Sequence, residues 1–515
     1  MKPELDVLVI GGGITGAGIA LEAARRGAKV LLVEQKDFAW GTSSRSSKLV
    51  HGGLRYLREG ALSLTRESVL ERRQLLKDAP GLVEPQRFLI GHYEGRSPGK
   101  ALLRLGLAVY DVLGGERHRH AVQADGYAML APHVDTAGLI AGSGYLDAKT
   151  DDARLVWRVL QEARSHGAEI HNYTRVDSLI LEKGQVRCAR LVAESGTTKD
   201  VCATCVINAT GAWADQLRQS MGESAKLRPL RGSHLLLPLW RLPVAQSISL
   251  FHPRDGRPVF AYPWEGMALV GTTDIDHPHD LQTEPSITTD EVDYLLEALR
   301  HTFPHLNLTA SDVVSTYAGV RPVVSSGAAD PSKETRDHIV LHEHGLISVT
   351  GGKLTTFRAI ALDTLQHAAK AHPALKLNWQ PSAILSPQYA QGPLARLDAC
   401  EQRRLLGRYG DQANALARGA KAEEWVRIAN TPITWAEIRW IARHEQVQHL
   451  DDLMLRRTRL GLVLPRGGEV WLPTIQNLAQ TELGWSADRW QAEVLRYQEL
   501  IARCYSVPTA SKETT

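Results

Sequence analysis

The sequence predicts a multidomain α/β protein: a Rossmann-type dinucleotide-binding domain, a mixed-sheet substrate domain inserted into it, and an all-α C-terminal domain. Three observations predict this organisation. A strand, a glycine-rich turn, a helix and a second strand open the chain, strand-rich stretches fill its middle, and a helical, tryptophan-rich pattern follows residue 385. The chain has 515 residues, which at about 150 residues per domain fits three folding units.

The first element is a dinucleotide-binding unit. Residues 6–10 form a short apolar run typical of a strand buried on both faces, and Gly11, Gly13 and Gly16 follow in a G-x-G-x-x-G pattern. A helical stretch and a second strand come next and end at Glu34. The glycines would allow a tight turn, close approach of a pyrophosphate and close helix packing, and the acid would accept hydrogen bonds from ribose hydroxyls.

A small, hydroxyl-rich segment, residues 41–56, follows the second strand. It is too polar and too interrupted by glycine to be core. We therefore expect it to lie along the bound ligand, with Thr42, Ser43 and Ser47 in contact. A solvated serine loop is the alternative.

Two later strands also end in glycine turns. Residues 201–209 lead into Gly211, and residues 346–349 lead into Gly352 and Lys353. Backbone amides together with a cation would suit an anion or the electron-rich edge of a reduced flavin. A glycine-capped turn with a surface lysine is the alternative interpretation.

Eight segments, in this order, closely resemble the FAD-dependent glycerol-3-phosphate dehydrogenases of bacteria and mitochondria. They are VIGGGITGAGIA, TSSRSSKLVHGGLRYL, TDDARLV, INATGAWAD, GSHLLLP, VGTTD, GVRP and VTGGKLTTFR. The resemblance covers residues 5–360 and continues at 444–462. It implies an FAD-binding fold like that of glutathione reductase and D-amino-acid oxidase. The implied division is an FAD-binding domain in three parts (1–95, 141–225 and 331–380), a basic amphipathic segment (96–140), a substrate domain (226–330) and a helical domain (385–508).

The resemblance also implies a reaction: oxidation of sn-glycerol 3-phosphate to dihydroxyacetone phosphate, with hydride passing from C2 to N5 of FAD and electrons then passing to membrane quinone. We expect Arg55 and Arg321 to bind the phosphate through bidentate contacts, with Tyr56 adding a hydroxyl. His51 is the first candidate for the base that takes the C2 hydroxyl proton, and His234 is the second. Lys353 would bind substrate and stabilise developing negative charge. The expected flavin contacts are Gly11, Gly13, Gly16, Glu34, Thr42, Ser43, Ser47, Gly211, Gly352, Lys353 and Thr355.

The net charge and the cysteine content limit which partners and which cell compartment are expected. The net charge of +3 gives no overall field for nucleic acid, so no nucleic-acid partner is expected. Five cysteines, an odd number in 515 residues, do not form a disulfide framework, and this favours a reducing, intracellular compartment. Cys202 and Cys205 lie three apart in one predicted strand, on opposite faces, and are interpreted as two packing thiols. No metal site is predicted, and FAD is expected to be held without a covalent bond.

The chain start leaves no room for a signal peptide, and no apolar run is long enough to span a bilayer, so neither feature is expected. Residues 96–120 read as a basic amphipathic helix that could lie in the headgroup plane of an anionic lipid surface. An ordinary packed helix is the alternative. The resemblance favours peripheral attachment to the cytoplasmic side of the inner membrane.

The C-terminal region is expected to be a helical core. Arg456, Arg457 and Arg459 are interpreted as a solvated or dimer-facing patch, and a homodimer is expected. The core residues would include Trp425, Trp435, Trp440, Trp471, Trp485 and Trp490.

Other functions stay open at this point. They are an oxygen-using glycerophosphate oxidase, a flavoenzyme for amines or hydroxy acids, and a non-enzymatic flavin-binding or structural protein. Ala148, Lys149 and Thr150 receive no role.

Overall fold

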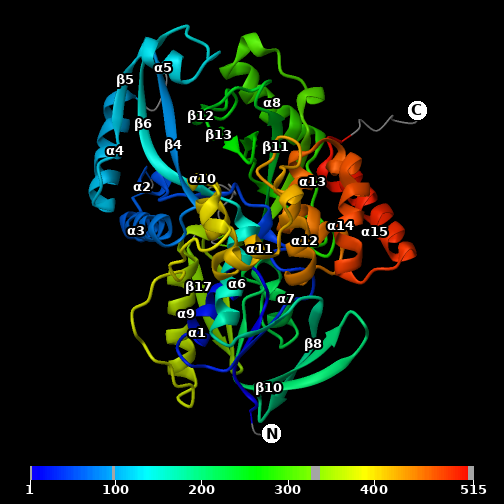
Figure 1. Ribbon diagram of the computed structural model, residues 1–515. Helices are drawn as coiled ribbons and strands as arrows, with labels where there is room; N and C mark the ends of the chain where they lie inside the picture. Colours follow the sequence, from blue (N-terminus) through cyan, green and yellow to red (C-terminus); the bar gives the residue numbers. More distant parts are fainter. Residues whose placement is uncertain are drawn as a thin grey trace, which may run out of the picture.

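The computed structural model describes residues 3–58, 60–95, 99–325, 327, 334 and 337–508, apart from the side chains of Arg55 and Arg58. Two sheets organise the chain. One lies in the lower half of Figure 1 and the other in the upper half, with the last helices of the chain on the right. The predicted α/β fold with a mixed second sheet and a helical C-terminal region is confirmed.

The first sheet has the order β17-β18-β10-β1-β2-β7. Its centre is parallel, with Val7 of β1 opposite Val30 of β2 on one side and Cys205 of β10 on the other. The strands are β1 (Leu5–Ile10), β2 (Val30–Val33), β7 (Glu169–His171), β10 (Thr198–Asn208), β17 (His338–Glu343) and β18 (Leu346–Gly351), and the hairpin β8 (Thr174–Glu182) and β9 (Gln185–Ala193) extends from β10.

Three helices cover this sheet, and α1 packs against the other two. The predicted helix after the glycine turn is confirmed, and it begins at Ile14, inside the G-x-G-x-x-G pattern. A Cβ on Gly16 would overlap the carbonyl oxygen of Gly11, so only glycine fits where this helix crosses the turn. The helices are α1 (Ile14–Ala24), α6 (Asp152–Ser165) and α9 (Phe357–Ala371).

The second sheet follows the order β15-β11-β14-β13-β12-β4-β6-β3, and β16 and β5 pair with β11 and β6. Its strands are β3 (Leu49–Val50), β4 (Val83–Tyr93), β5 (His120–Gln123), β6 (Leu139–Thr150), β11 (Leu227–Pro238), β12 (Ser247–Phe251), β13 (Pro258–Trp264), β14 (Met267–Gly271), β15 (Ile275–Asp276) and β16 (Ser315–Val324). The surrounding helices are α2 (Leu54–Arg58), α3 (Leu62–Asp78), α4 (Lys100–Gly114), α5 (Ala124–Leu130) and α8 (Thr289–Thr302), whereas α7 (Ala214–Gln219) packs on β18 of the first sheet.

The C-terminal region is helical and shares one apolar core with part of the second sheet. Trp490 is fully buried in this core, and the other five tryptophans expected there are half-buried and pack against the core. The prediction that these tryptophans belong to a helical core is confirmed. The helices are α10 (Ala399–Tyr409), α11 (Ala413–Gly419), α12 (Trp435–His444), α13 (Leu460–Val463), α14 (Leu472–Leu483) and α15 (Ala487–Leu500), with π-helical turns at Asp452–Arg457 and Ile501–Tyr505.

The expected solvated arginine patch is wrong, because all three guanidinium groups are buried. Arg457 pairs with Asp37 at 2.8 Å, and Arg459 pairs with Asp151 at 2.8 Å and with Asp152. Arg456 shares Asp37 at 2.6 Å. Buried charges of this kind persist only when paired, and these partners lie more than 300 residues away in the chain.

The interpretation of Cys202 as a packing thiol is also wrong. Cys202 lies directly opposite Cys188 in the β9–β10 ladder, and the two form a disulfide. Cys205 stays a buried free thiol whose pKa is raised to about 12 by burial, so the pair within C-x-x-C is not bonded, as the strand geometry predicts. The partner was missed because cross-strand register cannot be read from cysteine spacing.

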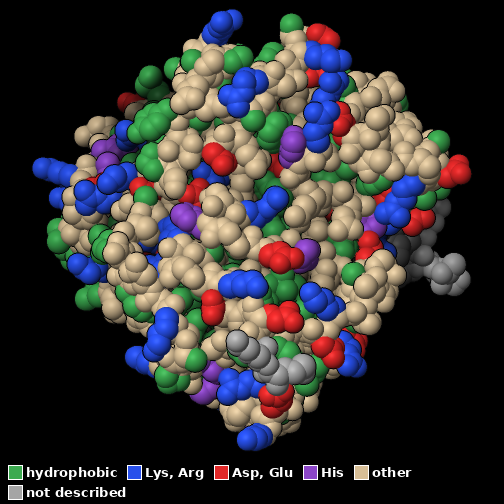
Figure 2. Space-filling view, turned by 60° about the horizontal axis from the view of Figure 1, so that its bottom comes forward, with side chains coloured by type: hydrophobic (Ala, Val, Ile, Leu, Met, Phe, Trp, Pro, Cys, Tyr) green, Lys and Arg blue, Asp and Glu red, His purple; other side chains and the backbone are tan. Residues whose placement is uncertain are grey.

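On the molecular face seen in Figure 2, basic and acidic side chains are intermingled over the surface. No helix among the described residues is long and apolar enough to cross a bilayer.

Candidate active site

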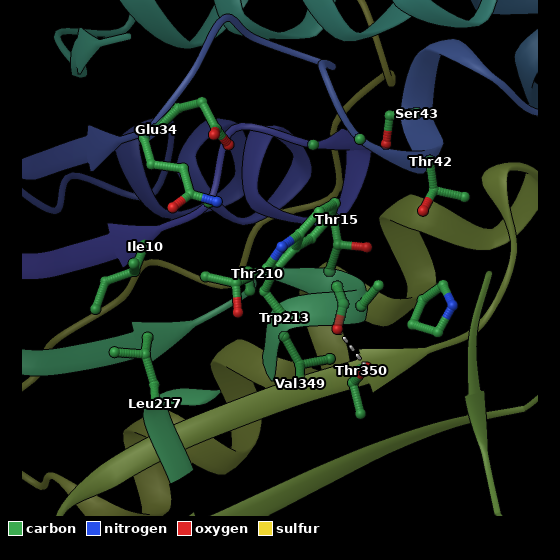
Figure 3. A pocket seen from close by; sticks show the side chains of 18 of the residues that line it. Ile10, Thr15, Glu34, Thr42, Ser43, Thr210, Trp213, Leu217, Val349 and Thr350 are labelled. Carbon is green, nitrogen blue, oxygen red and sulfur yellow. Dashed lines mark hydrogen bonds between the residues drawn. The ribbon is translucent and has the colours of Figure 1, made fainter. Parts of the chain in front are cut away.

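A cavity of about 480 Å³ opens at the carboxyl ends of β1, β2, β10 and β18. This is where ligands bind in open α/β sheets. Figure 3 shows side chains from these strands and from the following turns directed into the same space. The lining includes Gly11, Gly13, Thr15, Glu34, Trp40, Thr42, Ser43, Thr210, Gly211, Trp213, Thr350, Gly352 and Lys353.

The glycine turn and Glu34 form the floor of this cavity. The Glu34 carboxylate accepts hydrogen bonds from the backbone N–H of Gly12 at 2.7 Å and of Lys36 at 3.0 Å. These bonds fix the carboxylate at the end of β2, where the ribose of a dinucleotide would lie. Burial raises the pKa of Glu34 above its usual value.

The hydroxyl-rich segment is not a solvated loop, because Ser44, Arg45 and Lys48 are buried. Two of its predicted flavin contacts, Thr42 and Ser43, line the cavity. Ser43 Oγ accepts the N–H of Ile14 at 3.0 Å and so lies at the start of α1. Ser47 instead places its hydroxyl 2.9 Å from Nε2 of His234.

The turn after β18 carries Lys353 on the opposite wall. Gly351 and Gly352 both have positive φ, at 83° and 76°. The hydroxyl of Thr350 donates to the carbonyl of Gly211 at 3.2 Å and ties together the ends of β18 and β10, the dashed bond in Figure 3. The helix after this turn begins at Phe357, behind a 3₁₀ turn at Leu354–Thr356, so the two glycines precede the helix rather than start it.

The structure brings four of the predicted site residues together. The Nζ atom of Lys353 lies 4.1 Å from the ring centroid of Tyr56 and donates to Ser68 Oγ at 2.7 Å. The hydroxyl of Thr355 accepts the N–H of His51 at 3.1 Å and donates to the carbonyl of His51 at 3.2 Å. His51 is the residue that follows β3, and the two bonds to Thr355 hold its backbone beside the turn that carries Lys353.

Burial lowers the pKa of Lys353 to about 8. The lowered pKa means that the surroundings solvate the ammonium form of Lys353 poorly. An anion that binds next to this group would therefore stabilise its positive charge. The side chain of Arg55, the neighbour of Tyr56 and a predicted phosphate ligand, lies outside the described residues.

A second group of predicted residues lies on β11 and β16. His234 is fully buried and stacks on Tyr317, with ring centroids 4.5 Å apart. Burial first, and then the nearby Arg321 and Lys48, hold the pKa of His234 well below its usual value, so its imidazole is neutral. The Arg321 guanidinium donates to Asp274 at 2.7 Å and to the hydroxyl of Thr272 at 3.1 Å.

Sequence reasoning missed the residues that hold the loop from behind. Asp152 accepts the N–H of Ser46 at 3.0 Å and its hydroxyl at 2.7 Å, and pairs with Lys48 at 2.9 Å. Asp151 caps α6 by accepting the N–H of Arg154. A D-D pair before a helical pattern is an N-cap signal that could have placed Asp151, but not the pairing of Asp152 with Lys48.

The three residues without an assigned role belong to β6. Lys149 donates to the carbonyl of Pro263 at 2.7 Å, and the hydroxyl of Thr150 donates to the carbonyl of Leu82 at 2.9 Å. Ala148 is buried opposite Val50 of β3. They join β6 to its neighbours behind the loop.

FAD fits this cavity. The glycine turn leaves backbone exposed for a pyrophosphate, Glu34 is held at the ribose position, and Lys353 supplies a cation on the opposite wall. The lining runs from Glu34 at the end of β2 to Lys353 after β18, as a dinucleotide site requires.

Comparisons with known proteins agree with this geometry. Residues 6–358 match a family described as FAD dependent oxidoreductase, and residues 363–490 match the C-terminal domain of alpha-glycerophosphate oxidase. The chain is 34% identical to the aerobic glycerol-3-phosphate dehydrogenase of Staphylococcus saprophyticus, over 88% of this chain and 86% of that one. It is 41% identical to the enzyme of the same name from Bacillus subtilis, over 70% of this chain and 66% of that one.

Solved structures give the same result. A glycerol-3-phosphate dehydrogenase from Bacillus halodurans complexed with FAD is 29% identical, with a TM-score of 0.77 and coverage of 97% of this chain and 94% of that one. An L-α-glycerophosphate oxidase from Mycoplasma pneumoniae with FAD bound is 20% identical, with a TM-score of 0.60 and coverage of 76% and 100%, and shares the fold. The chain therefore belongs to the aerobic glycerol-3-phosphate dehydrogenase family of FAD-dependent oxidoreductases.

Proposed function

We propose that this flavoenzyme oxidises sn-glycerol 3-phosphate to dihydroxyacetone phosphate and passes the electrons to membrane quinone. The observation that carries the proposal is the grouping of His51, Tyr56, Lys353 and Thr355 beside the dinucleotide cavity. The group offers a base, a hydroxyl and a cation where substrate would meet the flavin end of the cofactor. The names of the relatives support the choice of substrate.

Held by the glycine turn and Glu34, FAD would supply the hydride acceptor, at N5, for oxidation of the substrate at C2. In our proposal His51 takes the proton of the C2 hydroxyl, and its backbone bonds to Thr355 hold it in place. Lys353 stabilises negative charge that develops on the substrate oxygen or the flavin. Arg321, with Arg55 and Tyr56, binds the phosphate.

His234 is the second candidate for the base. Its neutral imidazole could accept a proton, but it lies behind Ser47, with Nε2 directed at that hydroxyl. We therefore propose His51 first. His51→Asn should lower kcat far more than Ser47→Ala, whereas a reversed order would favour His234 acting through Ser47.

A bleaching experiment tests the substrate. Anaerobic addition of glycerol 3-phosphate to the yellow enzyme should discharge the flavin bands within seconds, and equal amounts of glycerol or of inorganic phosphate should leave them unchanged. Persistence of the bands with glycerol 3-phosphate, in a preparation that dithionite does bleach, would contradict the proposal.

An oxygen-using oxidase is the second candidate function. The match of residues 363–490 to the C-terminal domain of alpha-glycerophosphate oxidase favours it. Stoichiometric hydrogen peroxide during turnover without quinone would support the oxidase. Fast reduction of a soluble quinone analogue with little peroxide would support the dehydrogenase.

We propose that α4 lies against an anionic lipid surface on the cytoplasmic side of the inner membrane. One face of α4 is buried through Leu107 and Tyr110, yet Leu102, Leu105 and Val112 on the other face are 65%, 63% and 78% exposed. This helix lies along the left edge of Figure 1, away from the C-terminal helices. The expected helix over 96–120 is shorter than predicted: α4 ends at Gly114, so Lys100 and Arg104 are its basic residues, and His120 begins β5. An exposed apolar stripe beside basic side chains is typical of interfacial binding.

Vesicle flotation tests this surface. The protein should bind vesicles containing anionic lipid, and Leu102→Ser with Leu105→Ser should release it, whereas the same change at an exposed apolar residue elsewhere, Leu495→Ser, should not. Binding that survives the double change would contradict the assignment. We also propose a homodimer, which light scattering of the full chain would reveal as twice the chain mass.

A further inference from the structure

We propose that the π-helical turn Ile501–Tyr505 controls retention of FAD. Tyr505 and Glu284 position Arg45, and Arg45 in turn holds the backbone of the cavity wall at Trp40 and Gly41. We call Arg45, Glu284 and Tyr505 the C-terminal clamp. This inference concerns cofactor binding and does not depend on the proposed substrate.

Tyr505 ends the π-helical turn that follows α15. Its hydroxyl accepts hydrogen bonds from Arg45 at 3.3 Å (Nε) and 3.2 Å (Nη2), and donates to the Glu284 carboxylate. The next residue fixes the turn against the second sheet, because the Thr316 hydroxyl on β16 donates to the carbonyl of Ser506 at 3.1 Å. Residues 505 and 506 are thus bonded to three separate segments, at Arg45, Glu284 and Thr316.

Arg45 connects this turn to the cavity. One terminal nitrogen of its guanidinium pairs with Glu284, and the other donates to the carbonyls of Trp40 and Gly41, the latter at 3.3 Å. The guanidinium also lies 5.0 Å from the ring centroid of Trp40. Trp40 and Gly41 line the dinucleotide cavity, so every bond that Arg45 makes on this side orders the wall that FAD would touch.

The surroundings leave the clamp no room to rearrange. Arg45, Glu284 and Tyr505 are 4%, 9% and 5% exposed. A Cβ on Gly319 of β16 would lie 2.6 Å from the carbonyl oxygen of Arg45, so the loop rests directly on that strand. Charged groups buried this deeply depend on each hydrogen bond, because none can be replaced by bulk water.

The consequence is thermodynamic coupling between two distant regions. If an ordered C-terminal turn favours the loop conformation that binds FAD, then bound FAD must stabilise that turn by the same free energy. The coupling is therefore measurable from either end, at the cofactor or at residues 501–507.

Tyr505→Phe tests the first direction, with Tyr497→Phe as the matched control. Tyr497 is also buried and donates a hydroxyl hydrogen bond to the carbonyl of Gly467 at 2.6 Å, and among the described residues it has no hydrogen bond to Arg45, Glu284 or Tyr505. The dissociation constant of FAD from the apoprotein, followed by flavin fluorescence, should rise about tenfold for Tyr505→Phe because hydrogen bonds to two charged groups are lost. The control should change it by less than about twofold. Equal effects in the two variants, or no effect in either, would overturn the proposal.

Hydrogen exchange in the unaltered chain tests the second direction and needs no variant to fold. FAD should slow amide exchange at residues 501–507 markedly, and more than within α14 of the same domain. Unchanged exchange at 501–507 on FAD addition would overturn the proposal. Neither experiment uses substrate. A negative result here would therefore contradict only the role of the C-terminal clamp, and a negative bleaching test would contradict only the proposed substrate.

Discussion

The floor and the walls of the cofactor cavity are built in different ways. The floor, from β1 to Glu34, is one continuous segment, and its acid bonds to a residue only 22 positions earlier, Gly12, although β1 and β2 are also paired with β10 and β7. The walls combine His51, Lys353 and the loop after β2 with Asp151 and Asp152, which pair with Arg459 of the C-terminal region. The residues that form the floor thus come from one segment of the sequence, whereas the walls bring together residues that are far apart in it.

The largest effect should come from the floor. Gly16→Val places a side chain on the Gly11 carbonyl, where there is no space, and should cost at least about 3 kcal/mol and abolish FAD binding. Melting temperature and flavin content of the purified protein measure both effects. Gly106→Ala is the control, because a Cβ at that α4 position meets nothing within 4 Å. If the Gly16→Val protein were stable and still bound FAD, the prediction that this turn has no space for a side chain would be wrong.

The second largest effect should come from the buried ion pairs of the walls, whose loss should lower the stability of the protein. Asp152→Asn removes the charge facing Lys48 and Arg459, all three fully buried, and should lower the free energy of unfolding by about 3–5 kcal/mol. Chemical denaturation measures this loss. The matched control is Asp200→Asn, which breaks an exposed pair with Arg190 and should change little. Similar losses at both sites would show that burial of the network adds nothing to the stability of the walls.

The substrate side of the wall gives a smaller, kinetic effect. Arg321→Met should raise the KM for glycerol 3-phosphate by about 30- to 100-fold, because a charge-assisted contact to phosphate is lost, with a lesser effect on kcat. Steady-state kinetics with a soluble electron acceptor measure it. Arg254→Met, at an exposed arginine paired with Glu297, is the control. An unchanged KM would leave Arg321 as only a structural partner of Asp274.

The same contrast explains what the sequence could predict. The glycine turn, Glu34 and the strands after it follow from spacing and hydrophobic pattern, and the eight ordered segments placed the chain in its family. The grouping of Lys353 with Tyr56 could only be inferred by resemblance, since nothing local links residues about 300 positions apart.

The failures have one physical cause. Arg456, Arg457 and Arg459 look like surface charge in sequence, and their burial depends on Asp37, Asp151 and Asp152 arriving from the first domain. The Cys188–Cys202 disulfide likewise depends on the register of β9 against β10. Charge and cysteine content are local properties, whereas pairing is decided by the fold.

The finest test of the walls is the pH dependence of Lys353. Because burial lowers its pKa to about 8, the ammonium form is present below pH 8 and is lost as the pH rises. If the positive charge stabilises the anionic groups of the reaction, kcat/KM should fall about fourfold between pH 7 and pH 8.5. Lys353→Arg should remove this decline by keeping the charge, and Lys353→Met should give a flat, low profile over the same range. A decline that persists in Lys353→Arg would assign the titration to another group, and the wall would then act through the position of Lys353 rather than its charge.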